Sequence, residues 1–420
     1  MLVYVQNNNG QPLMPTERCG KVRRMLKDGR AKVVKRCPFT IRLSYHAQEN
    51  TQPVNLGIDA GSKTVGVSAT TSDRELYAAE LTLRTDITDN ISTRREFRRA
   101  RRNRKTRYRK PRFKNRVHSK HKGWLAPSVE AKIAAHIQTV VNVCKILPIS
   151  HITVETASFD TQMIQAIKDG KTMPEGTDYQ QGPQLGFWNV REYVLFRDDH
   201  KCQCCKGKSK DPILNVHHIE SRKTGGNAPN NLITLCETCH KGYHKGTVQI
   251  PKTIRRGTSL RDAAFMGIMR WTFYNRLKEM YPCIVSMTYG YITKNTRITH
   301  NLEKTHAVDA RCISGNPDAK PLGYWYRQKK VRCHNRQLHR ATILKGGYRK
   351  NNQAPKEVFG FRLFDRVEYD GQECFVFARR LSGSFAIRKL DGTRISDGKS
   401  WKKLKFLKHS GTILSERVIV

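Results

Sequence analysis

The amino-acid sequence predicts an α/β protein with several domains, and three observations support this. Its 420 residues are enough for two or three domains, and the 38% of hydrophobic residues can form real cores. Short apolar strands that end in acidic residues are joined by stretches with the apolar spacing of amphipathic helices. A segment rich in Cys and His, between residues 190 and 245, interrupts this series. We therefore expect a multi-domain fold with a separate Cys- and His-rich unit.

The charge of the chain points to its partner. Lys and Arg number 78 against 35 Asp and Glu, which gives a net charge of +43. So much like charge destabilises a compact chain unless a polyanion neutralises it, so we expect salt-dependent binding to nucleic acid. Composition alone leaves open both a passive basic protein, such as a ribosomal protein, and an enzyme. The sequence has no apolar run of the ~18 residues needed for a membrane span, and its N-terminus lacks the apolar region of a secretory signal.

Both ends of the chain read as small modules. At the N-terminus the pattern predicts a strand at 2–5, a turn with the sequence Pro12-Leu13-Met14-Pro15, a basic helix at 18–27, and strands at 31–34 and 39–43. From about residue 317, Gly and Asp turns separate strand-like runs, which predicts a small β-barrel. The clearest of these runs are residues 358–362, 366–369, 374–379 and 385–390.

Two acidic residues each end an apolar strand. Asp59 lies in a region, 54–72, that alternates like a hairpin, and Glu155 ends a short strand at 151–155. Between them, residues 128–147 have the apolar spacing of an amphipathic helix. Taken alone, either acid is a weak indication of a metal site.

A later helix, residues 303–314, carries His306 and Asp309. These residues are three apart, so both lie on one face of the helix. The pair alone could be an ordinary polar helix face. Together with Asp59 and Glu155 it completes a set of acids from separate elements, and such a set can hold two metal ions about 4 Å apart.

Four cysteines form two Cys-x-x-Cys pairs, Cys202 with Cys205 and Cys236 with Cys239, about thirty residues apart. Four thiolates in this spacing satisfy the tetrahedral geometry of a structural zinc ion. Cys204 competes as a ligand, but only Cys202 and Cys205 have the two-residue gap. The alternative is a set of buried free thiols. Paired Cys spacing in a long chain also favours a reduced compartment over a disulfide framework.

Histidines and an asparagine accompany these cysteines. His217 and His218 lie in a predicted strand, Asn231 follows a Gly-rich loop, and His240 directly follows the last Cys. This series resembles the HNH nuclease pattern, in which an unprotonated imidazole activates water beside a divalent cation. The resemblance implies that His218 is the general base, Asn231 orients the loop, and His217 and His240 hold the catalytic metal. Surface histidines of a zinc ribbon are the alternative.

Arg and Lys dominate residues 94 to 122, where Glu96 is the only acid. A helix this positive needs phosphates around it, and many phosphate contacts give affinity without reading sequence. The alternative is a basic tail that binds any nucleic acid, but this segment lies inside the fold. The arginines that we expect to contact RNA are Arg94, Arg95, Arg98, Arg99, Arg101, Arg102, Arg104, Arg107 and Arg109.

Together these motifs resemble the IscB family, which comprises compact, transposon-encoded, RNA-guided DNA endonucleases related to the longer type II CRISPR effectors. The order of strand with Asp59, hairpin, helix, strand with Glu155, and helix with His306 and Asp309 is that of a RuvC-like nuclease with an RNase H-type fold. The resemblance is specific over residues 1 to about 315 and vaguer beyond. Its further motifs lie at residues 12–15, 155–162 and 186–193.

The resemblance implies the chemistry and the partners. Asp59, Glu155 and Asp309 would hold Mg²⁺ or Mn²⁺, with His306 as the general base; hard oxygen ligands suit Mg²⁺. The HNH site, also with Mg²⁺ or Mn²⁺, would cut the strand paired to the guide, and the RuvC-like site would cut the displaced strand. The implied partners are a structured guide RNA (omega RNA) and double-stranded target DNA. The protein would act as a monomer within a ribonucleoprotein in the prokaryotic cytoplasm, associated with the nucleoid when bound to DNA.

The same resemblance predicts seven segments. They are a PLMP module at 1–53, RuvC-like parts at 54–92, 125–185 and 251–316, an arginine-rich bridge helix at 93–124, an HNH nuclease with zinc knuckles at 186–250, and a C-terminal module at 317–420.

Two questions stay open from sequence. The C-terminal module either reads a short duplex motif beside the target or only clamps RNA; candidate basic residues there include Arg379, Arg388 and Lys402. A protein-only nuclease, such as a junction resolvase fused to a homing-type HNH module, would share both active sites and need no guide RNA.

Overall fold

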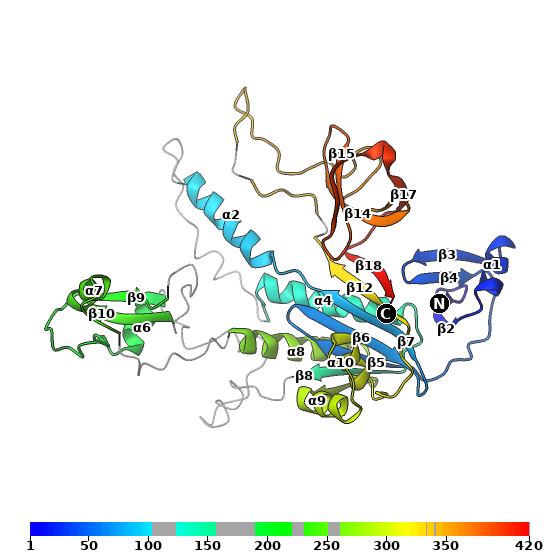
Figure 1. The fold of residues 1–420 in the computed structure, drawn as a ribbon, viewed down its shortest axis with the longest axis horizontal. Coiled ribbons are helices and arrows are strands. Elements are labelled where there is room, and N and C mark those ends of the chain that lie inside the picture. Colours follow the sequence, from blue (N-terminus) through cyan, green and yellow to red (C-terminus); the bar gives the residue numbers. More distant parts are fainter. Residues whose placement is uncertain are drawn as a thin grey trace. The chain divides into compact units, whose positions relative to one another are not determined.

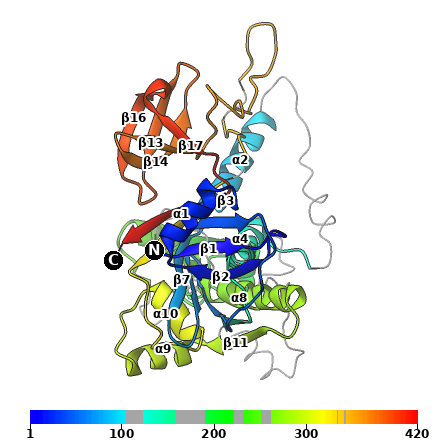
Figure 2. The same cartoon turned by 90° about the vertical axis from the view of Figure 1, so that its right-hand side faces the viewer.

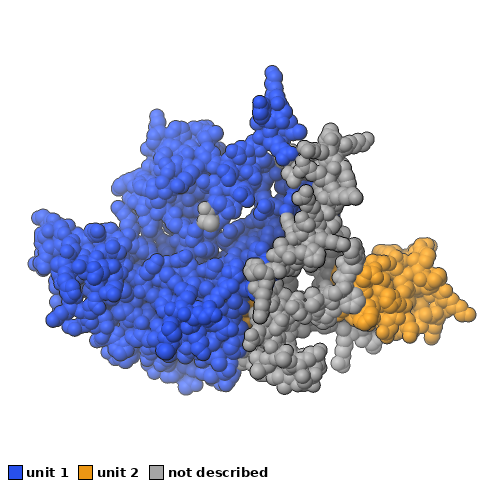
Figure 3. Space-filling model, turned by 180° about the vertical axis from the view of Figure 1, so that it is seen from behind, with its two compact units in different colours: residues 1–158, 269–420 blue, residues 159–268 orange. Residues whose placement is uncertain are grey.

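The computed structural model describes residues 1–102, 123–156, 190–220, 231–250, 261–332, 334–339 and 342–419. The chain divides into two compact units, coloured separately in Figure 3. The first unit contains Met1–Ser158 and Met269–Val420, and the second contains Phe159–Ile268. Among the helices in the described ranges, none is both long and apolar enough to cross a membrane.

A seven-stranded sheet lies at the centre of the first unit (Figure 1). In spatial order its strands are β11 (Val285–Tyr289), β8 (His151–Thr156), β5 (Asn55–Ala60), β6 (Thr64–Thr70), β7 (Glu75–Thr82), β12 (Tyr324–Lys330) and β18 (Ile413–Ile419). β5, β6 and β7 form an antiparallel meander, whereas β8 runs parallel to β5 and β11 runs parallel to β8. The side chains of β5 and β6 are almost all buried, so this is the core of the unit.

Four helices accompany the sheet: α4 (Pro127–Cys144), α8 (Arg261–Met280), α9 (Gly290–Thr299) and α10 (His306–Ile313). α4 begins with Pro127, whose missing N–H would be unsatisfied at that position anyway. Its apolar face buries Ile133 and Val140, as the spacing predicts. The ring of His136, on the same helix, packs 5.1 Å from that of Phe273 on α8.

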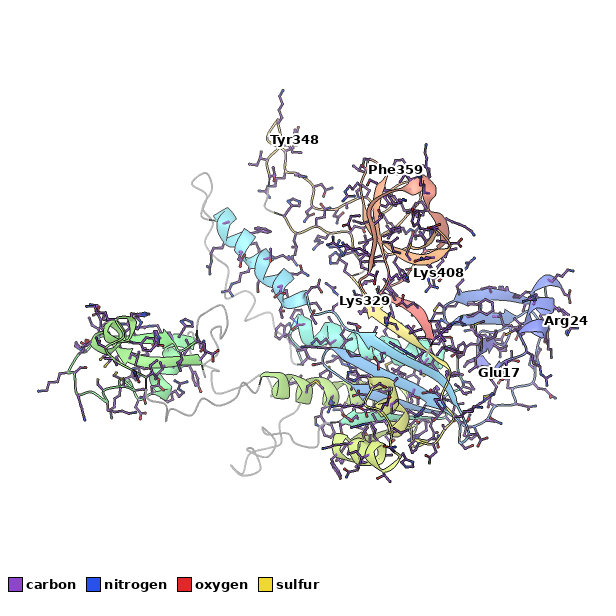
Figure 4. All side chains as sticks on the ribbon, in the orientation of Figure 1. Glu17, Arg24, Lys329, Tyr348, Phe359 and Lys408 are labelled. Atoms are coloured by element: carbon purple, nitrogen blue, oxygen red, sulfur yellow. The ribbon has the colours of Figure 1, made fainter. Side chains whose placement is uncertain are left out.

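The N-terminal residues form a separate four-stranded sheet with the order β2-β1-β4-β3, that is Pro12–Thr16, Val3–Gln6, Phe39–Leu43 and Ala31–Arg36. Helix α1 (Cys19–Lys27) packs on it through Val22 and Met25, while Arg24 on the outer side is exposed (Figure 4). The Tyr4 hydroxyl donates a hydrogen bond to the Leu76 carbonyl, 2.9 Å away, and so connects this sheet to the central one.

A five-stranded antiparallel sheet forms near the C-terminus, with its own core around Val367, Val376 and Phe385 (Figure 2). Its spatial order is β16 (Arg394–Ser400), β15 (Ser384–Arg388), β14 (Gln372–Arg379), β13 (Arg366–Tyr369) and β17 (Lys405–Lys408). We expected residues 317–420 to form one C-terminal module. Instead, the strands at its two ends, β12 and β18, pair with each other, and β12 extends the central sheet beside β7. Such pairing between distant segments leaves no local pattern to predict it from.

The second unit contains a small ββα arrangement. β9 (Leu214–His218) pairs antiparallel with β10 (Leu232–Cys236), and α7 (Glu237–His244) follows directly. α6 (Val190–Arg197) precedes them and contacts both strands. A further helix, α2 (Ile87–Arg102), belongs to the first unit and starts six residues before the expected bridge segment.

Candidate functional sites

Two of the predicted acids end neighbouring strands. Ile58 on β5 lies opposite Val154 on β8 in the parallel register, so the next residues, Asp59 and Glu155, emerge at the same edge of the sheet. Both carboxylates are largely buried. Asp309 comes to this edge from α10.

Glycines bring α10 close to the sheet. A Cβ atom at Gly66 would collide with the His306 carbonyl, and one at Gly57 would collide with the Ala310 carbonyl. These two positions therefore allow the helix backbone to lie directly on β6 and β5. This close packing places His306 and Asp309 beside the strand that ends in Asp59.

Each of these residues has a charged partner. The Nδ1 atom of His306 lies 2.6 Å from Oδ2 of Asp59. Arg270 on α8 donates to Oε1 of Glu155 at 2.9 Å, and Arg297 on α9 pairs with Asp309 at 2.9 Å. Neither arginine was predicted from sequence, because no local motif marks them.

Arg270 also connects the two acid-bearing strands. Its Nε atom donates to the carbonyl of Ala60, which follows Asp59, at 2.9 Å. A weaker bond, 3.5 Å long, joins it to the carbonyl of Thr156, which follows Glu155. The guanidinium therefore holds the ends of β5 and β8 at a fixed separation.

Three acidic side chains lie here together with Arg270, Arg297 and His306. Burial raises the pKa of Glu155, and the nearby charges of Asp59 and Asp309 raise it further, against the opposing effect of Arg270. The pKa of Asp309 is raised by burial and then by Asp59. The hydrogen bond to Asp59 raises the pKa of His306. A cation bound among the carboxylates would relieve their repulsion, so the oxygen donor set fits a hard divalent ion.

The carboxylate oxygens of Asp59, Glu155 and Asp309 do not all lie within 4.8 Å of one another. Within the described ranges, two groups of potential metal ligands have all their ligand atoms within 4.8 Å of one another. One consists of four cysteines and the other of three histidines. The acids are brought to one edge of the sheet, but each is engaged with a basic side chain.

The three-histidine group lies on β9 and α7 in the second unit. It consists of His217, His240 and His244. The ring centroids are 5.1 Å apart for His217 and His240, 5.1 Å for His217 and His244, and 4.7 Å for His240 and His244. The sequence analysis missed His244, although its four-residue spacing from His240 places both on one helix face.

The His217 imidazole fits a metal ligand. Its Nε2 atom is buried and makes no hydrogen bond among the described residues. Burial lowers its pKa to about 4, with further lowering by His240 and His244. Burial and His244 also lower the pKa of His240. The two rings are therefore neutral at pH 7, as metal ligation requires.

His218 and Asn231 occupy different places from this group. His218 neighbours His217 on β9, so its side chain points to the other face of the strand. The Asn231 side chain is buried and accepts a hydrogen bond from the Glu220 N–H at 2.8 Å. It also donates to the Glu220 carbonyl at 3.1 Å. Asn231 thus fixes the backbone just beyond the strand that carries both histidines.

The four predicted cysteines come together. The Sγ atoms of Cys202, Cys205, Cys236 and Cys239 form one group, and those of Cys205 and Cys236 are 3.8 Å apart. Cys204 contacts the Gln249 carbonyl instead, which excludes it from the group. All described cysteines are free thiols. Four sulfur atoms at this spacing fit tetrahedral zinc.

The arginine-rich segment is described only in part. Arg94, Arg95, Arg98 and Arg99 lie on α2, where Arg94, Arg95 and Arg99 are exposed. The backbone of Arg101 and Arg102 completes the helix. Arg104, Arg107 and Arg109 lie outside the described residues.

Sequence profiles of two protein families match the chain. The profile described as RRXRR protein matches residues 3–182, and residues 98–102 read Arg-Arg-Ala-Arg-Arg. The profile of the HNH endonuclease family matches residues 202–246, which contain the four cysteines and the three-histidine group. Anaredoxin from Nostoc sp. (strain PCC 7120 / SAG 25.82 / UTEX 2576) is 35% identical over 63 residues, which make up 14% of this chain and 79% of that protein.

Some solved structures are similar at low identity. Streptococcus thermophilus Cas9 in complex with the AGAA PAM matches with 14% identity and a TM-score of 0.29, over 46% of this chain and 26% of that one. The type II-C Cas9 enzyme from Actinomyces naeslundii matches with 11% identity and a TM-score of 0.25, over 63% and 60%. The chain thus spans about a quarter of the S. thermophilus chain.

Similarity this low adds nothing to the assignment, which rests on the two profiles. The residues that they cover include the His and Cys groups described above. Residues 3–182 are therefore similar to the RRXRR family, and the chain is a nuclease with an HNH endonuclease domain.

Proposed function

We propose that this protein is an RNA-guided DNA endonuclease with two metal-dependent centres. The observation that carries the proposal is the presence of two separate ligand sets in one chain. Three histidines lie on a ββα unit, and three carboxylates lie at one edge of the central sheet. Two independent centres suit the cleavage of two strands, one at each centre.

In the HNH centre, His217, His240 and His244 would hold the catalytic ion. A bound divalent ion would polarise the scissile phosphate and stabilise the leaving oxygen. His218 would take the proton from the attacking water, and Asn231 would keep the following backbone in place. Three imidazoles suit a transition-metal ion better than Mg²⁺, so we extend the expected Mg²⁺ or Mn²⁺ to other transition metals at this centre.

In the RuvC-like centre, Asp59, Glu155 and Asp309 would hold Mg²⁺ or Mn²⁺. His306 would act as the general base. The strand order β11-β8-β5-β6-β7, with β6 antiparallel, supports an RNase H-type core. Arg270 and Arg297 would be displaced from the carboxylates, or share them, when the ion binds.

RNA guidance rests on charge and position. The net charge of +43 demands a polyanion, and α2 exposes arginines between the segments that carry Asp59 and Glu155. As a bridge helix, α2 would bind phosphates of the guide RNA. In this proposal residues 1–53 form the PLMP module, and 54–92, 125–185 and 251–316 are the RuvC-like parts. Residues 93–124 are the bridge, 186–250 the HNH domain with its structural zinc, and 317–420 the C-terminal module.

The test labels each strand of a target separately and resolves the products on a denaturing gel. His218→Ala should cut only the displaced strand, and Asp59→Ala should cut only the strand paired to the guide. A single variant that still cuts both strands would contradict the division of labour. A protein-only nuclease is the second candidate, and purified protein that cuts a chosen target with no bound RNA would establish it.

The C-terminal module would read a short duplex motif beside the target. Arg379 does not suit that role, because its guanidinium donates to the carbonyls of Lys356, Phe361 and Pro355 at 2.6, 2.9 and 3.1 Å. Lys402 lies on an exposed turn and is free to reach DNA. With a randomised flanking library, Lys402→Ala should change which flanks are cut. Unchanged flank preference with weaker RNA binding would favour an RNA clamp.

A further inference from the structure

Two tyrosines flank Gly290, which lies next to the Glu155 carboxylate. Tyr289 ends β11, and Tyr291 lies in the first turn of α9. Their rings are nearly parallel, with an interplanar angle of 11° and centroids 6.0 Å apart. Tyr291 is 55% exposed, so solvent reaches this aromatic pair.

Gly290, between the two tyrosines, lies against the Glu155 carboxylate. A Cβ atom at Gly290 would lie 3.3 Å from Oε1 of Glu155. The backbone at 290 is therefore in contact with the carboxylate, and Tyr291 follows immediately. Among the described residues, β11 is an edge strand of the central sheet (Figure 2).

The surroundings suit a nucleic-acid strand. Lys294 is exposed one turn after Tyr291, on the same face of α9. An aromatic ring beside a cation matches the two parts of a nucleotide, since the base stacks on the ring and the phosphate meets the ammonium group.

We propose that Tyr291 stacks on an unpaired nucleobase of the DNA strand that enters the carboxylate centre, and that Lys294 contacts its phosphate. Tyr289 supports the Tyr291 ring from behind. The stacked base would hold the strand so that a neighbouring phosphate lies against Asp59, Glu155 and Asp309. This inference depends on the proposed function in one respect, namely that the carboxylate centre cuts an unpaired DNA strand.

The first experiment measures cleavage of each strand against protein concentration. Alanine substitution of a stacked aromatic weakens binding by about 5-fold to 150-fold per base. Tyr291→Ala should therefore raise the concentration for half-maximal displaced-strand cleavage within that range. Tyr291→Phe should behave like wild type because the ring is kept. Paired-strand cleavage should not change in either variant.

Ile298→Ala is the matched control. Ile298 is 59% exposed, lies seven residues further along α9 on the same face, and has no aromatic ring. It should leave displaced-strand cleavage near wild type. If Tyr291→Ala has no larger effect than Ile298→Ala, or if Tyr291→Phe is as defective as Tyr291→Ala, stacking by Tyr291 is wrong.

The second experiment needs no cleavage. The protein is mixed in Ca²⁺ with a duplex that contains an unpaired bubble, and 2-aminopurine is placed at successive positions of one bubble strand. Stacking on Tyr291 should quench its fluorescence at one or two positions for wild type and Tyr291→Phe, but not for Tyr291→Ala. Equal quenching in all three proteins would overturn the proposal. If the Tyr291-dependent quenching is present but Asp59→Ala still cuts the displaced strand, the proposed division of labour fails and the stacking site stands.

Discussion

The Nδ1 atom of His306 lies 2.6 Å from Oδ2 of Asp59, although the two residues are 247 positions apart in the chain. His306 is on a helix and Asp59 ends a strand, and they meet because Gly57 and Gly66 let α10 lie directly on the sheet. A base beside a carboxylate that can hold a metal ion is the arrangement that water activation requires.

His306→Ala should slow displaced-strand cleavage by about 100-fold or more, because general-base catalysis contributes 10²–10⁴-fold. Paired-strand cleavage should continue at the wild-type rate. His300→Ala is the control: its Nδ1 lies 2.7 Å from Oδ1 of Asp318, so it removes a similar His–Asp pair outside the site. Equal losses from the two variants would show that His306 matters only for folding.

His244→Ala should raise the metal concentration needed for paired-strand cleavage by about tenfold or more, because one of three nitrogen donors is removed. The measurement is a titration of each strand's cleavage rate with Mn²⁺ and with Mg²⁺. Displaced-strand cleavage, at the carboxylate centre, serves as the internal control. An unchanged metal dependence of paired-strand cleavage would remove His244 from the ligand set.

Cys236→Ser should release zinc and unfold the second unit, because metal binding supplies much of the folding free energy of such small sites. Elemental analysis and limited proteolysis between residues 190 and 250 measure both effects. Displaced-strand cleavage should survive while paired-strand cleavage is lost. Cys204→Ser is the matched control, since Cys204 lies outside the four-cysteine group. Active wild-type protein without zinc would contradict this prediction.

Acid should destabilise the first unit through His136. Burial lowers the pKa of this imidazole from 6.5 to about 4, so the unfolded chain binds the proton more readily than the folded one. The stability present above pH 6.5 is therefore lost as the pH falls from 6.5 towards 4, by up to about 3 kcal/mol. His136→Asn should make the melting temperature less dependent on pH in that range. If the melting temperatures of the two proteins change equally with pH over this range, His136 makes no such contribution to stability.

The sequence predicted many of the local elements and the grouping of four cysteines. Apolar spacing predicted α4 and the strands that end in Asp59 and Glu155, because burial of one face imposes a period on neighbouring residues. The Cys pairs predicted the four-cysteine group, since ligands two residues apart can bind one ion through a single turn of chain.

The tertiary structure decided what depends on distant segments meeting. In the folded chain Arg270 pairs with Glu155, and Arg297 pairs with Asp309. Strands β12 and β18 join the central sheet, and Arg379 donates to the carbonyl of Phe361 in a neighbouring loop. An arginine carries the same charge wherever it stands in a sequence with 78 basic residues, so its partner is set by packing alone. The sequence by itself determined which side chains could do chemistry here, whereas the packing of helices on the sheet determined which of them share a site, because contacts between distant segments leave no periodic trace in the chain.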